Sequence, residues 1–113
     1  MFTKETCALK VNGKGERFSP TDLVATALSN CMLTIMGIKA EQMGLDLEGT
    51  TVEIDKIMAA SPRRIAEIVI DFYVKGVCSA KEKKILEAAA ATCPVAQSLH
   101  PDTKQTENLK NRG

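Results

Sequence analysis

Four cysteines and one histidine are the residues of this 113-residue sequence whose types could carry redox, nucleophilic or metal chemistry. The cysteines are Cys7, Cys31, Cys78 and Cys93, and the histidine is His100. Structural zinc sites usually contain closely spaced pairs of ligands, and this sequence has no Cys-x-x-Cys pair. The spacing therefore argues against a zinc site and leaves thiol chemistry or simple core packing for the cysteines.

Cys31 and Cys93 have different predicted surroundings. Cys31 is about three turns into a helix that Ser19-Pro20-Thr21-Asp22 begins, and nothing near it in the sequence would activate its thiol. Cys93 precedes Pro94, which opens a short helix, so unpaired N–H groups and the helix dipole would favour a thiolate there. The residues alone predict that Cys93 is the more acidic thiol. A buried Cys31 and a purely capping Cys93 remain as alternatives.

The long helix that carries Cys31 has an unusual apolar pattern. It is predicted from Pro20 to about Met43, with Gly44 as the residue that ends it. Apolar side chains lie on nearly every face between Leu23 and Ile38, which is typical of a helix buried on all sides. At about 1.5 Å per residue the helix is roughly 35 Å long, too long for one chain of this size to cover. The sequence therefore predicts a homodimer.

The remaining periodic segments predict a β-hairpin, two further helices and an edge strand, which gives an α+β fold. In chain order they are a weak strand at 7–11, a strand at 49–57, a turn at 60–64, a strand at 65–74, a helix capped by Ser79, a short helix at 94–99 and an edge strand at 103–109.

Composition excludes several classes of protein. Hydrophobic residues make up 44% and charged residues 26% of the chain, as expected for one globular domain rather than a disordered chain. A net charge of +1 and the absence of Trp argue against a nucleic-acid partner. No apolar run approaches the ~18 residues that a membrane-spanning helix needs, so we expect no membrane span. The charged start of the sequence lacks a secretory signal, so we expect a cytoplasmic protein.

Two motifs together resemble those of the OsmC/Ohr family, the osmotically inducible and organic hydroperoxide resistance proteins. Residues 19–31, SPTDLVATALSNC, are similar to the first motif, in which a Pro, an acidic residue and a Leu lead into a helix-borne Cys. Residues 92–99, TCPVAQSL, are similar to the second motif, a Cys-Pro-Val/Ile run followed by a polar residue and Leu. Their order and the helix–hairpin–helix between them also match the family.

The resemblance implies a single OsmC-like domain over residues 1–113, in an intertwined homodimer with the long helices at its centre. It also implies two equivalent sites at the dimer interface, each holding a pair of cysteines. Family members commonly have about three strands before the first motif. Because Cys31 comes early in this sequence, we expect the N-terminal sheet to be shortened.

The resemblance also implies a reaction, the reduction of an organic hydroperoxide without metal, haem or flavin. Specificity for organic over inorganic peroxide is expected if four side chains line an apolar pocket, namely Leu28, Met32, Ile35 and Met36. Cys31 would be the peroxidatic residue and Cys93 the resolving one, and a small or lipoyl-borne dithiol would then reduce their disulfide. The family activates its first Cys with an Arg that a carboxylate holds. Asp22 lies near the carboxylate position, although Thr21 follows the Pro where the peroxidase branch has Glu, and Arg17 is the nearest candidate for the Arg.

Two other functions remain open at this stage. The same cysteine pair could serve a thiol–disulfide redox protein or sensor with little peroxidase activity. Alternatively, both cysteines could be structural, in a non-catalytic dimeric binding module. Cys7 and Cys78 belong to neither motif, and we expect no role for them in thiol chemistry.

Overall fold

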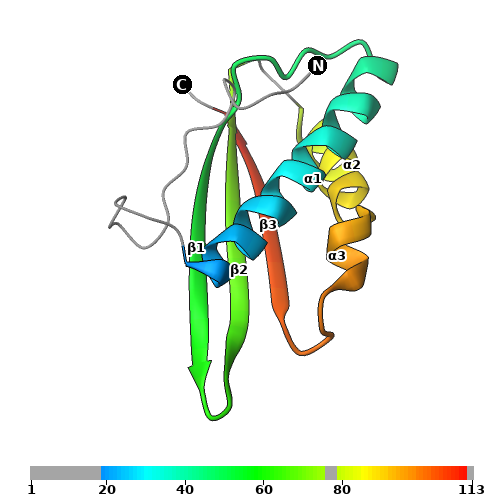
Figure 1. The fold of residues 1–113 in the computed structure, drawn as a ribbon. Coiled ribbons are helices and arrows are strands. Elements are labelled where there is room, and N and C mark those ends of the chain that lie inside the picture. The colour runs from blue at the N-terminus through cyan, green and yellow to red at the C-terminus, as the bar shows by residue number, and fades with distance from the viewer. Residues whose placement is uncertain (1–18, 76–78, 112–113) are drawn as a thin grey trace.

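The computed structural model describes residues 19–75 and 79–111, which form three helices and three strands (Figure 1). In chain order these are α1 (Pro20–Gln42), β1 (Thr51–Ala60), β2 (Arg63–Val74), α2 (Ala80–Ala90), α3 (Pro94–Ser98) and β3 (Lys104–Asn111). The predicted strand at 7–11 lies outside the described residues, as do Arg17 and Cys78.

Local sequence signals set both ends of α1, as predicted. The Ser19 side chain accepts the backbone N–H of Asp22, and the Asp22 carboxylate accepts the backbone N–H of Ser19, which completes a capping box. After the cap residue Met43, Gly44 has a φ of 76°, a conformation that glycine adopts without the steric cost other residues meet. A second capping box, between Ser79 and Glu82, begins α2.

The three strands form one sheet in the order β1-β2-β3. β1 and β2 make an antiparallel hairpin, whereas β3 runs parallel to β2 at the other edge of the described sheet. The hairpin is longer than predicted because β1 continues to Ala60 and β2 starts at Arg63, so that Ser61 and Pro62 alone connect them. Proline has no backbone N–H for a sheet ladder, which places Pro62 in the turn.

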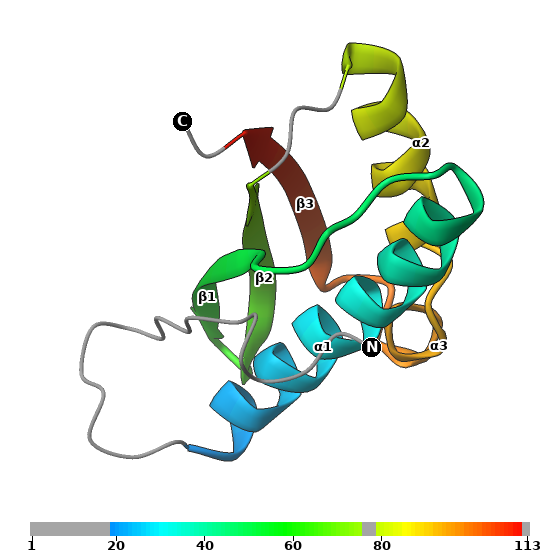
Figure 2. The ribbon, with the colours of Figure 1, turned by 90° about the horizontal axis from the view of Figure 1, so that it is seen from above.

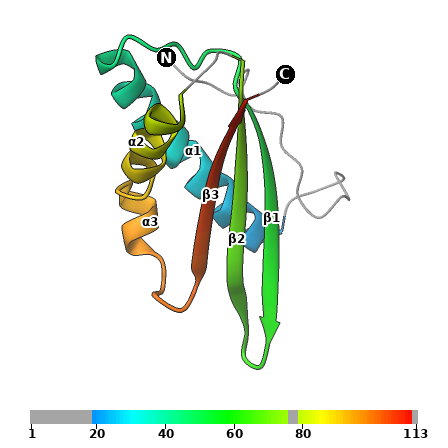
Figure 3. The ribbon, with the colours of Figure 1, turned by 180° about the vertical axis from the view of Figure 1, so that it is seen from behind.

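The helices lie on one face of the sheet (Figures 1 and 3). Seen from above, α1 crosses the sheet beside the α2–α3 pair (Figure 2). The core fills the space between these two layers, and its largest fully buried side chains come from both. They are Phe72, Leu28, Met32, Leu33, Met36, Leu47, Ile54, Ile68, Ile70, Leu86, Val52 and Val74. The alternation predicted for β2 is confirmed, since Ile68, Ile70, Phe72 and Val74 all face this core.

α1 buries only part of its apolar surface within one chain. Its buried residues face the sheet, but Leu23 and Ile38 remain 57% and 54% exposed. Ala27, Asn30 and Thr34 lie between them on the same outer stripe and are also exposed. The outer stripe, defined by these five residues, therefore contains no charged side chain.

By length and composition alone, α1 could also cross a membrane, which differs from the expectation that no segment would. The core helix of a globular protein can pass the same test. Here the inner face of α1 packs against the sheet and is part of the core, as such a helix would. This helix therefore gives only weak evidence for a membrane.

A buried ion pair attaches the start of α1 to β1. The Lys56 Nζ donates to Asp22 Oδ1 and to Thr21 Oγ1, both at 2.7 Å. The two charged side chains are only 5% and 10% exposed. The hydrogen bond from Lys56, followed by that from the backbone N–H of Ser19, holds the pKa of Asp22 below its ordinary value of 3.8. The pair therefore links the helix start to the middle of the sheet edge.

We predict that Asp22→Asn lowers the free energy of unfolding by about 1–3 kcal/mol at neutral pH, because the buried Lys56 ammonium loses its charged partner. A carboxyl with a lowered folded pKa stabilises the fold above its ordinary pKa and loses this effect as the pH falls through the folded value. Urea unfolding should therefore show the difference between variant and wild type shrinking below about pH 3.8.

The control is Asp22→Asn combined with Lys56→Met, which removes both charges and should recover part of the lost stability. A stability difference that stayed constant down to the lowest pH would contradict the assigned role of the ion pair.

Candidate thiol site

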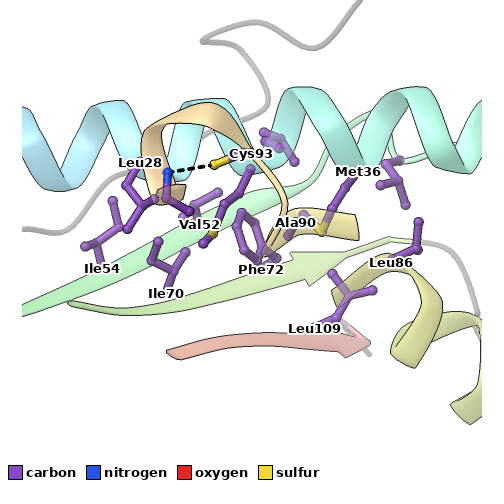
Figure 4. Close-up of a cluster of buried hydrophobic side chains, with 14 of the residues drawn as sticks. Leu28, Met36, Val52, Ile54, Ile70, Phe72, Leu86, Ala90, Cys93 and Leu109 are labelled. Carbon is purple, nitrogen blue, oxygen red and sulfur yellow. Dashed lines mark hydrogen bonds between the residues drawn. The ribbon is translucent and has the colours of Figure 1, made fainter. Parts of the chain in front are cut away.

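Cys93 lies at the junction of α2 and α3, where it is the N-cap of α3. Its Sγ accepts the backbone N–H of Ala96 at 3.3 Å (Figure 4). Pro94 at the first helical position lets the chain start a new helix directly after the thiol. The side chain has no exposed surface and belongs to the hydrophobic core that also holds Leu28 and Ala90. The helix-capping position predicted from sequence is therefore confirmed.

The acidity predicted for Cys93 is wrong. Burial raises the pKa of its thiol to about 11, and this effect outweighs the hydrogen bond from the backbone N–H of Ala96, which acts in the opposite direction. The neighbouring Cys31 thiol raises the pKa further through a hydrogen bond and its charge. A thiolate in apolar surroundings loses its hydration, and a five-residue helix does not replace it. Cys93 therefore rests as a neutral thiol.

Cys31 lies in the middle of α1 and is half-buried, with its thiol free. It packs at the margin of the core and influences the titration of Cys93, so the fold brings the two thiols together. Along α1 its position follows that of Ala27 by one turn, and Ala27 belongs to the exposed outer stripe. The two cysteines are therefore neighbours that differ in solvent exposure, since Cys31 has exposed surface and Cys93 has none.

The side chains around Cys31 differ from those predicted to form an apolar substrate pocket. Leu28, Met32 and Met36 are almost fully buried and point into the core between α1 and the sheet, where Figure 4 shows Leu28 and Met36. Of the four residues in that prediction, Ile35 is half-buried and packs at the margin of the core, as Cys31 does. Because the helix has 3.6 residues per turn, Leu28, Met32 and Met36 lie on its inner face, away from solvent.

The predicted supporting residues are not assembled around Cys31 in the described part of the chain. Asp22 is about 13 Å from Cys31 along the helix axis, at about 1.5 Å per residue, and its carboxylate bonds Ser19 and Lys56. Arg17 lies outside the described residues. His100 is exposed, and its Nδ1 accepts the backbone N–H of Asp102. Supporting roles for Asp22 and Arg17 stay predictions.

Sequence reasoning missed three side chains that position this site. Lys56 holds the start of α1, and its presence at a core-facing position of an alternating strand was the available signal. The Gln97 Nε2 donates to the carbonyl of Ala91 at 3.0 Å, and the Gln105 Nε2 donates to the carbonyl of Ala96 at 3.1 Å. Nothing in the sequence marks these two amides, because their partners are backbone carbonyls placed by the fold.

Within residues 19–75 and 79–111, no group of three or more His, Cys, Asp or Glu side chains is arranged to hold a metal ion. The free thiols of this part of the chain are Cys31, which is half-buried, and Cys93, which is buried.

The sequence matches the OsmC-like protein family over residues 13–108, which include both cysteine motifs. The chain therefore belongs to the OsmC-like family. A search of curated proteins finds no match.

Among solved structures, the chain is similar to a Psychrobacter arcticus 273-4 protein named for osmotic stress induction and a detoxification response. The two are 52% identical with a TM-score of 0.80, and the match covers 85% of this chain and 70% of that one.

Two more distant structures share the fold. An organic hydroperoxide resistance protein OsmC from Legionella pneumophila is 17% identical with a TM-score of 0.69, over 88% of this chain and 74% of its own. An organic hydroperoxide resistance protein from Elizabethkingia anophelis is 17% identical with a TM-score of 0.71, over 86% and 71%. At this level of identity the two comparisons establish the α+β fold of the family.

Proposed function

We propose that this protein is a cysteine-based peroxidase that reduces organic hydroperoxides, with Cys31 as the peroxidatic residue and Cys93 as the resolving residue. The observation that carries the proposal is the unequal state of two neighbouring thiols. Cys31 has exposed surface on α1, whereas Cys93 is buried and its pKa is raised to about 11. Of the two residues, only Cys31 has surface from which a peroxide could approach. Family membership supports the same assignment.

The reaction has three balanced steps. The Cys31 thiolate attacks one oxygen of the hydroperoxide, the O–O bond breaks, and the products are a Cys31 sulfenic acid and an alcohol that takes up a proton. The Cys93 sulfur then displaces the hydroxyl group from Cys31, which forms the disulfide and releases water. A dithiol reductant, of the small or lipoyl-borne kind that the family implies, reduces the disulfide and is itself oxidised. None of these steps uses a metal or an organic cofactor.

Cys31 needs a positive charge or a hydrogen-bond donor to stabilise its thiolate. We propose Arg17 for this role, as the resemblance implies. We propose that Asp22 supports the site indirectly, by holding the start of α1 in place. Lys56 already neutralises Asp22, at 2.7 Å. This contact supports a structural role for Asp22 more than direct contact with the thiolate.

We also propose that the protein is an intertwined homodimer in the cytoplasm, with residues 1–113 in a single domain. The outer stripe of α1 supports the dimer, because its five residues carry no charge and include two exposed large side chains, Leu23 and Ile38. Cys31 lies beside this stripe. A second copy seated there would place apolar surface beside the thiol and leave it open to substrate, which favours an organic over an inorganic hydroperoxide.

A specific observation also favours a second function, a thiol–disulfide sensor of the same fold. Because Cys93 is buried and neutral at rest, its attack on a Cys31 sulfenic acid would be slow at neutral pH. A long-lived oxidised Cys31 suits the detection of peroxide better than its rapid removal. Steady turnover with a hydroperoxide and dihydrolipoamide distinguishes the peroxidase from the sensor.

The test of the function separates the two cysteines. Cys31→Ser should abolish consumption of an organic hydroperoxide, because the accessible nucleophile is gone. Cys93→Ser should consume about one equivalent per chain in a first phase and not turn over, since nothing resolves the sulfenic acid. With excess oxidant, a slower second phase should consume about one more equivalent as the sulfenic acid becomes sulfinic acid. Peroxide consumption and intact mass measure both outcomes.

The matched controls are Cys7→Ser and Cys78→Ser, which lie outside both motifs and should leave turnover unchanged. If Cys93→Ser blocked the first reaction while Cys31→Ser did not, the two roles would be reversed. Unaltered consumption in both the Cys31→Ser and the Cys93→Ser variants would reject the peroxidase.

The dimer is tested by charging the outer stripe. Ala27→Glu places a carboxylate at an exposed position of the stripe, and sedimentation at micromolar concentration should show a shift from about twice the chain mass toward the mass of one chain. Ala88→Glu is the matched control, because Ala88 is an exposed alanine on α2 away from the stripe. A wild-type protein that sediments as a folded monomer would contradict the dimer.

A further inference from the structure

We propose that the side-chain amides of Gln97 and Gln105 are a latch on α3 that keeps Cys93 in its resting position and limits the rate of disulfide formation. The inference rests on the proposed function and adds a control over its second step. In this view the two glutamines are positioning residues, because they act on Cys93 through the backbone of α3 and the turn before it.

The two glutamine amides form hydrogen bonds with the same short segment that contains Cys93. Ala96 donates its N–H to the Cys93 Sγ at 3.3 Å, and its carbonyl accepts the Gln105 Nε2 from β3 at 3.1 Å. Gln97 Nε2 reaches back to the carbonyl of Ala91, at the end of α2, at 3.0 Å. One amide therefore ties α3 to the sheet and the other ties it to α2.

α3 depends on such contacts because it is short. It has five residues, Pro94–Ser98, and a helix of this length is not stable by its own hydrogen bonds. The chain is extended on both sides of it, at Cys93 and Leu99. Its buried residue is Ala96, a small side chain, and the half-buried Val95 and Leu99 pack at the margin of the core. The two amide bonds add to these contacts and tie α3 to β3 and to the end of α2.

Disulfide formation requires Cys93 to leave this arrangement. The two sulfurs must approach to about 2.05 Å with a restricted dihedral angle. Cys31 is on a 23-residue helix whose inner face is packed against the core, so that most of the movement falls to Cys93. To turn toward Cys31, the Cys93 sulfur must give up the Ala96 N–H and α3 must shift. Holding α3 in place therefore prolongs the life of the Cys31 sulfenic acid.

The electron balance is that of the proposed resolving step. The Cys93 sulfur bonds to the Cys31 sulfur, the S–O bond of the sulfenic acid breaks, and the hydroxyl group leaves as water with the Cys93 proton. If this step is slow, a second molecule of hydroperoxide oxidises the Cys31 sulfenic acid to sulfinic acid. The latch thus sets how much peroxide the site tolerates before it is inactivated.

The test uses Gln105→Met and Gln97→Met in the full-length protein, since Met keeps the length of the side chain and removes the donor. Thr103→Val is the matched control, because the Thr103 hydroxyl donates to the Ile65 carbonyl of β2 at 2.9 Å, just before β3, rather than to a carbonyl of α3. Rapid mixing with one equivalent of cumene hydroperoxide, followed by acid quench and mass analysis, gives the rates of Cys31 oxidation and of disulfide formation separately.

We expect each glutamine variant to form the disulfide about threefold to tenfold faster, the change that follows from losing one hydrogen bond. The rate of Cys31 oxidation should stay as in wild type, and less sulfinic acid should form with excess hydroperoxide. Thr103→Val should change neither rate. Disulfide formation that is unchanged or slower in the glutamine variants would overturn the latch, as would equal acceleration by Thr103→Val.

A second arm separates this inference from the proposed function. Diamide oxidises thiol pairs to disulfides without a peroxide, so it reports on closure of the pair even in a protein that does not reduce hydroperoxides. If wild type fails to react with cumene hydroperoxide but Gln105→Met still closes faster with diamide, the peroxidase fails and the latch stands. If peroxide oxidises Cys31 but no variant changes the closure rate in either arm, the latch fails and the peroxidase stands.

Discussion

Burial of the Cys93 sulfur at the α2–α3 junction is the constraint on which the chemistry of this structure depends. The sulfur has no exposed surface, accepts one backbone N–H and lies next to the half-buried thiol of Cys31. Its pKa is raised to about 11, mainly by burial, so one thiol of the pair is kept neutral and out of reach of oxidants. In the proposed reaction, that asymmetry would give the two cysteines different roles. Movement of the five-residue helix α3 would then be part of the mechanism.

The rest of the fold keeps α1 in place above this junction. The core between α1 and the sheet holds the inner face of the helix, and the Lys56–Asp22 pair attaches its first turn to β1. β3, parallel to β2 at the edge of the described sheet, supplies the Gln105 amide that reaches Ala96. The inner face of α1 is packed against the core, whereas α3 has only five residues, so in the proposed reaction we expect the Cys93 sulfur to be the one that moves.

Sequence reasoning predicted those features that local interactions determine. Both capping boxes, the α1 stop at Gly44 and the helix start at Pro94 follow from neighbouring residues and are confirmed. Sequence reasoning failed for those features that depend on contacts between residues distant in sequence. The helix-cap position of Cys93 predicts an acidic thiol, but the core around it reverses the effect. Leu28, Met32 and Met36 were expected to line a substrate pocket, and the rotation of α1 turns them into the core. The backbone partners of Gln97 and Gln105 exist only in the folded chain.

The most direct test of the central claim is to identify which sulfur a hydroperoxide oxidises first in the unmodified protein. Less than one equivalent of an organic hydroperoxide is added in the presence of dimedone, which traps sulfenic acids, and the modified peptides are mapped by mass spectrometry. The account predicts that the dimedone adduct is on Cys31, with the remaining oxidised protein carrying a Cys31–Cys93 disulfide. An adduct on Cys93, or a disulfide that joins either residue to another cysteine, would contradict it.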